Sequence, residues 1–157
     1  MDRIASLALA AVSAAALGAG PALGLESLTG VYQGKIKCSG LLGGTKVKGK
    51  VDVEVDVSDT GGSLVLAIGE LGSFLGFAVT DVKKPEQGAV SAVSCPLSAA
   101  TLDGAMLNAD VKIKAGSDKG SLHGTLFLSG DTEGDARTCD LKVDRISIVS
   151  PKIAGCP

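Results

Sequence analysis

The sequence predicts an all-β protein, an antiparallel meander of about eight strands that closes as a small up-and-down barrel. Three observations indicate this fold. Apolar and polar residues alternate with period two in several segments, glycine-rich turns separate those segments, and no segment after residue 25 carries a helical pattern. Closure would hide the apolar face of a single sheet and remove its exposed edges. A two-sheet β-sandwich is the alternative.

Residues 1–24 are predicted to be a signal peptide that is removed on export. An unbroken run of apolar and small residues at 4–17 is followed by Ala22 and Gly24, which stand at the −3 and −1 positions of a signal-peptidase site. The run is too short to cross a bilayer core roughly 30 Å thick. We therefore expect a single mature domain, residues 25–157, without a transmembrane helix and located in the periplasm or outside the cell.

The first two strands are predicted at residues 30–38 and 46–57. In the second of these, every odd position is Val or Gly and every even position is Lys, Asp or Glu. Such strict alternation is typical of a strand with one buried and one solvated face. We therefore expect the whole valine face, from Val47 to Val57, to be buried.

Six further segments complete the meander: residues 63–68, 74–82, 89–95, 107–115, 121–129 and 139–148. The first three are apolar at nearly every position, whereas the last three alternate. In the last segment the apolar parity shifts after Val143, which predicts a β-bulge near Asp144 and Arg145. The stretch 96–106 leaves room for one helical turn.

Alternate connectors of an up-and-down barrel lie at opposite ends. Short polar turns are expected at residues 58–62, 83–87 and 116–120, and the other four connectors are longer or more apolar. Because loops held by a rigid frame often carry function, we predict a contact site at the second end. Its candidate residues are Leu41, Leu42, Leu71, Phe74, Leu97, Leu102 and Met106. The alternative is that Leu41, Leu42 and Leu71 only close the barrel.

Four cysteines, an even number in an exported chain, predict two disulfides. In a closed barrel the first and eighth strands are antiparallel neighbours, so Cys38 at the end of one lies beside Cys139 at the start of the other. This predicts Cys38–Cys139 and leaves Cys95–Cys156. A bridge between Cys38 and Cys95 would instead indicate the sandwich.

The residues that carry common chemistry are few. A net charge of −2 argues against a nucleic-acid binder. The single histidine, His123, is predicted to lie on the surface, without a nucleophile motif. Asp131, Glu133 and Asp135 share one loop and are expected to form a solvated acidic turn rather than a calcium site. We predict no enzyme activity, no cofactor and no metal.

Three functions remain. The first is an exported module that binds a small apolar ligand or an envelope partner at the loop end bearing three cysteines. The second is a structural or interaction protein with a filled core and no ligand. The third, an outer-membrane barrel, is disfavoured because one Tyr and three Phe cannot supply two aromatic girdles. A cavity of a few hundred Å³ would favour the first.

Overall fold

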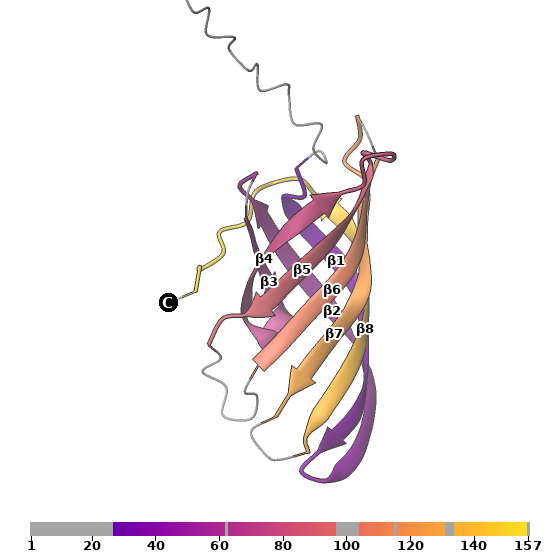
Figure 1. The fold of residues 1–157 in the computed structure, drawn as a ribbon, viewed down its shortest axis with the longest axis vertical. Helices are drawn as coiled ribbons and strands as arrows, with labels where there is room; N and C mark the ends of the chain where they lie inside the picture. The colour runs from indigo at the N-terminus through magenta and orange to yellow at the C-terminus, as the bar shows by residue number, and fades with distance from the viewer. Residues whose placement is uncertain (1–26, 62, 97–103, 115, 131–133, 157) are drawn as a thin grey trace, which may run out of the picture.

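The computed structural model describes residues 27–156 apart from 62, 97–103, 115 and 131–133. These residues form one closed, antiparallel, up-and-down barrel of eight strands (Figure 1), and the sandwich alternative is wrong. In chain order, the elements are β1 (Gly30–Leu42), β2 (Thr45–Asp59), β3 (Leu64–Ile68), the 3-10 helix η1 (Gly69–Leu71), β4 (Ser73–Thr80), β5 (Gln87–Ser94), β6 (Gly104–Ile113), β7 (Gly120–Ser129) and β8 (Ala136–Ser147). The predicted signal peptide lies outside the described residues. The described part contains no helix that could cross a membrane.

The inner face of the barrel is packed with side chains. Tyr32 and Phe74 are fully buried in it, together with aliphatic residues from every strand except β4. A cavity able to hold a ligand would expose the side chains that line it, yet the members of this core are at most 9% exposed. The barrel is therefore filled where these residues meet.

A hydrogen-bond network closes the end at which the chain enters the barrel. The Tyr32 hydroxyl donates to the Leu28 carbonyl oxygen at 2.8 Å, and both residues are buried. The Arg145 guanidinium donates to the carbonyl oxygens of Ser27, Ser117 and Asp118, at 3.0, 3.3 and 2.8 Å. One arginine thus ties the entering chain to the β6–β7 turn.

The first connector is shorter than the sequence predicts. Strand β1 continues to Leu42, and only Gly43 and Gly44 join it to β2. Their φ angles of 56° and 72° lie in the left-handed region that two-residue hairpin turns require and that glycine adopts at little cost. The Asp135 carboxylate accepts hydrogen bonds from both glycine N–H groups, at 2.8 and 3.3 Å. Asp135 is 8% exposed, so the prediction that it is solvated is wrong.

The valine face of β2 is buried over only part of its length. Val55 and Val57 belong to the core, but Val51 is 61% exposed. The reason is that β3 pairs with β2 only from Val55 to Asp59. The remainder of β2 pairs with β1 alone, and only the tip of the β1–β2 hairpin, beyond Gly40, extends past the other strands (Figure 1).

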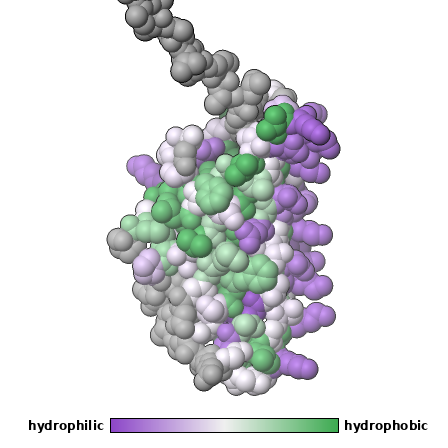
Figure 2. All heavy atoms as spheres, in the orientation of Figure 1, coloured by the Kyte–Doolittle hydropathy of each residue, from purple (hydrophilic) through white to green (hydrophobic). Residues whose placement is uncertain are grey.

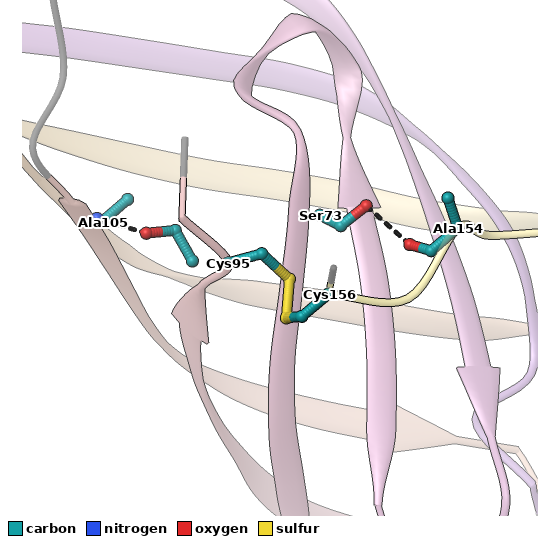
Figure 3. The surroundings of a disulfide bond; sticks show 6 residues. Ser73, Cys95, Ala105, Ala154 and Cys156 are labelled. Atoms are coloured by element: carbon teal, nitrogen blue, oxygen red, sulfur yellow. Dashed lines mark hydrogen bonds between the residues drawn. A yellow bond between two sulfur atoms is a disulfide. The ribbon is translucent and has the colours of Figure 1, made fainter. Parts of the chain in front are cut away.

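The structure contains the two disulfides that the closed barrel predicts. Cys38 and Cys139 lie directly opposite each other on β1 and β8, with Cα atoms 3.9 Å apart. Cys95 pairs with Cys156, in a C-terminal tail that follows β8 and returns along the outside of the barrel (Figures 1 and 3). The predicted bulge is present in β8, where Ile146 is skipped in the pairing with β1.

Candidate functional site

The residues predicted at the loop end do not form one surface. Phe74 is fully buried in the core, and the partly buried Leu71 packs against the core. Leu41 and Leu42 are 37% and 39% exposed near the tip of the β1–β2 hairpin, and Met106 lies on the outer face of β6. Leu97 and Leu102 lie outside the described residues. Of the predicted residues, Met106 belongs to an apolar surface that the sequence reasoning missed.

That surface is a row of four apolar side chains on the outside of the barrel, which we call the apolar row: Leu75, Val93, Met106 and Phe127. The strand register places Leu75 of β4 opposite Val93, Val93 opposite Met106, and Met106 opposite Phe127 of β7. Directly opposed side chains of antiparallel strands lie about 5 Å apart on the same face. The four are 43–57% exposed. Together they make a continuous apolar band across four strands.

A second row with more polar groups runs beside the apolar row. It consists of Phe77, Ser91, Asn108 and Thr125, again on successive strands. Ser91 and Asn108 hydrogen-bond to each other through their side chains. Two shallow depressions of about 360 and 390 Å³ open on the outer face of β4–β7, which we call the outer wall, and Phe77 and Ser91 line both. The wall therefore combines an apolar centre with hydrogen-bonding groups at its side.

The opposite side of the barrel is charged. On β8, β1 and β2 the corresponding outer rows are Lys142, Lys35 and Asp52 in one line and Asp140, Lys37 and Lys50 in the next. Lys35 forms an ion pair with Asp52. Figure 2 shows the hydrophobic residues gathered on the face toward the viewer and the hydrophilic residues along one edge. The barrel thus has two different outer walls.

The inner faces of β4 and β5 have room only for small side chains where Gly76 and Ala92 meet. Gly76 and Ala92 are neighbours on the inner face, and a Cβ atom at Gly76 would lie 2.2 Å from the Ser91 carbonyl oxygen and 2.5 Å from the Ala92 Cβ atom. The sequence signal was the near-continuous apolarity of residues 74–82 and 89–95. A strand that is apolar at both parities carries apolar side chains on both faces.

The described residues contain no group of three or more metal-ligating side chains. His123 is exposed on the outer wall, opposite Asp110 of β6. The carboxylate of Asp135 accepts hydrogen bonds from the two glycine N–H groups of the hairpin turn. Asp131 and Glu133 lie outside the described residues.

Comparison of the chain with protein-family models, with curated proteins and with solved structures finds no match.

Proposed function

We propose that this protein is an exported binding module, rather than an enzyme, that holds a partner protein against the outer wall of β4–β7. The observation that carries the proposal is the apolar row, because the barrel register aligns four half-exposed apolar side chains into one band. Contiguous apolar surface rimmed by polar residues is a common mark of an interaction site.

The filled interior favours this function over the binding of a small ligand inside the barrel. Tyr32, Phe74 and the aliphatic residues packed with them are buried in the interior, where a small barrel that binds a ligand would hold it. The depressions described above are on the outside and are open to solvent. An outer surface of this kind suits the broad contact of a protein partner.

A protein partner explains the wall better than a lipid does. A protein interface has an apolar centre and a polar rim that supplies hydrogen bonds. The apolar row, which includes Phe127, corresponds to such a centre, and the neighbouring row, which includes Asn108, supplies polar groups at its side. A barrel embedded in a membrane would need an apolar band around its whole circumference. Here β8, β1 and β2 carry charged side chains on their outer face.

Site-specific photo-crosslinking in the exporting cells tests the proposal. Phe127 is replaced by p-benzoylphenylalanine, and the same replacement at Lys35 on the charged wall serves as the control. Each is combined with Val93→Glu in the apolar row, or with Ser39→Glu, an exposed position that lies in the same outer row but on β1. Both glutamate substitutions add one negative charge to an exposed strand position.

We expect one protein adduct at position 127, lost with Val93→Glu, retained with Ser39→Glu and absent at position 35. The partner, identified by mass spectrometry and purified, should bind the Val93→Glu protein at least tenfold more weakly than the parent. Circular dichroism verifies that both variants fold. No adduct, equal adducts at both positions, a lipid adduct, or an adduct with a second copy of the chain would each overturn the proposal.

A further inference from the structure

One edge of the sheet is left unpaired in the part of the chain that the structure describes. Strand β2 pairs with β1 from Thr45 to Val57 but with β3 only from Val55 to Asp59. Near residue 53 this edge meets η1, because a Cβ atom at Gly69 would lie 3.4 Å from Val53 Cγ2. The segment 46–52 therefore presents alternate backbone N–H and C=O groups with no strand beside them, which we call the free edge.

Lysines are concentrated along the free edge. Lys46, Lys48 and Lys50 are exposed on the outer face of β2, and Lys50 lies opposite Lys37 of β1. Among the described residues none of these four forms an ion pair, since the one nearby pair joins Lys35 to Asp52. A chain with a net charge of −2 thus collects several lysines on the outer face of the β1–β2 hairpin, where Asp140 lies opposite Lys37 but no acidic residue lies opposite Lys46, Lys48 or Lys50.

We propose that the free edge of β2 binds an extended acidic segment of a partner protein, which adds a strand to the sheet. In a strand, alternate side chains on one face are about 6.8 Å apart, so acidic residues at every second position would match Lys46, Lys48 and Lys50. The intervening residues of the partner would lie beside Gly49 and the exposed Val51 on the other face. Main-chain hydrogen bonds would supply affinity, and the charges would select the sequence.

The backbone edge favours a peptide over other anions. Phospholipids, nucleic acids and polyphosphates can pair with lysine side chains but offer no repeating N–H and C=O groups for a strand edge. The lysines also have a protective effect, because the free edges of two copies carry like charges and repel each other. An acidic strand removes that repulsion, so the same residues that exclude other strands would admit this one.

Fluorescence anisotropy with the purified, oxidised full chain tests the inference. The probe is a labelled peptide of sequence Glu-Val-Glu-Ala-Glu-Val-Glu with blocked ends. One control peptide has Lys in place of Glu, and another is N-methylated at every backbone amide, which keeps the charge and removes the N–H donors of both strand edges. The triple variant Lys46→Glu, Lys48→Glu, Lys50→Glu is matched by Lys83→Glu, Lys84→Glu, Lys119→Glu, which has the same net charge and changes the two polar turns at the other end.

We expect the acidic peptide to bind saturably, and the β2 triple variant to bind it at least tenfold more weakly, with the matched variant within twofold of the parent. The N-methylated peptide should also bind at least tenfold more weakly. Hydrogen exchange of the parent should slow at residues 46–52 when the peptide is added. Absence of binding, or equal binding of the N-methylated peptide, would overturn the inference. Stronger binding to phosphatidylglycerol vesicles or polyphosphate than to the peptide would also overturn it. Far-UV circular dichroism confirms folding, and the apolar row is untouched, so these results are independent of the function proposed above.

Discussion

Tyr32 is the only tyrosine in a chain without tryptophan, so its absorbance reports on one buried site. Burial raises the pKa of its phenol above the ordinary value of 10.0, although the charge of Arg145 opposes the rise. The folded state therefore keeps this proton to higher pH than the unfolded state does. This contribution to stability is complete below about pH 10 and is lost as pH rises through the folded pKa. A titration at 295 nm should give a higher pKa in the native protein than in urea, and equal values would contradict the burial.

The same hydroxyl satisfies a buried carbonyl, which makes Tyr32→Phe informative. Removing the hydroxyl leaves the Leu28 carbonyl oxygen without its donor in a site that water does not reach. We expect a loss of about 1–3 kcal/mol in the free energy of unfolding, measured with urea. Ser91→Ala, which removes an exposed hydroxyl of the outer wall, should cost less than about 0.5 kcal/mol. Similar losses in both variants would mean that the Tyr32 hydrogen bond is not buried.

Two carboxylates lie on the same face of β2, and removing the charge of one should change the stability of the protein in the opposite direction from removing the charge of the other. Partial burial, and secondarily the charge of Glu54, raises the pKa of Asp56, whereas the hydrogen bond and charge of Lys35 lower the pKa of Asp52. Because the folded-state pKa of Asp56 is raised, the protein loses stability as pH rises through that pKa and the Asp56 carboxyl ionises. Because the folded-state pKa of Asp52 is lowered, the ionised Asp52 stabilises the fold, and this stability is lost as pH falls through that pKa. At pH 7, Asp56→Asn should therefore raise the free energy of unfolding slightly, because solvent screens this partly exposed carboxylate, and Asp52→Asn should lower the melting temperature. Thermal melts should lose both differences in strong acid.

At the scale of a single strand, β2 offers a direct comparison of a buried and an exposed valine on the same face. Val55 and Val51 have the same parity, but Val55 is 0% exposed and Val51 is 61% exposed. We expect Val55→Asp to cost several kcal/mol, enough to unfold a domain of ordinary stability, because it places an unpaired charge in the core. Val51→Asp should change the free energy of unfolding by less than about 0.5 kcal/mol. Equal effects on urea unfolding would show that the whole valine face is buried.

The alternation of side chains predicts which face of each strand points inward, but not how far its neighbours extend. The pattern at 46–57 is the strongest in the chain, yet Val51 is exposed because β3 is only five residues long. The same limit applies to the outer wall. Leu75, Val93, Met106 and Phe127 are each unremarkable in their own segments, and only the register across four strands brings them together. Register depends on turn geometry, which the residue pattern does not specify.

The whole barrel distributes its interactions unequally between two sides. The apolar row occupies β4–β7, and the free edge belongs to β2, on the charged side. The two disulfides also have different structural roles. Cys38–Cys139 joins β1 to β8 where the sheet closes, whereas Cys95–Cys156 fastens a tail to the end of β5. Near the second bond the Ser73 hydroxyl donates to the Ala154 carbonyl oxygen at 2.9 Å (Figure 3).

Loop length does not distinguish the two disulfides in stability, but burial distinguishes them in reactivity. Their sequence separations of 101 and 61 residues correspond to similar loop-entropy contributions, about 4–5 kcal/mol each. Reduction requires a thiolate to reach a sulfur atom. Each bond has one buried cysteine, Cys139 at 0% and Cys95 at 6% exposure, but the other cysteine is exposed in Cys95–Cys156 and only half-exposed in Cys38–Cys139.

We therefore expect a low concentration of dithiothreitol to open Cys95–Cys156 first. Alkylation and peptide mapping should then label Cys95 and Cys156 while Cys38 and Cys139 remain joined. The barrel should stay folded at that stage, because the hydrogen-bonded ladder of β1 and β8 does not depend on the tail. After alkylation and removal of dithiothreitol, the titration of Tyr32 in the same sample measures whether the core is intact. If the Tyr32 titration becomes that of the unfolded chain as soon as the first bond opens, the tail holds the barrel closed and the division of roles is wrong.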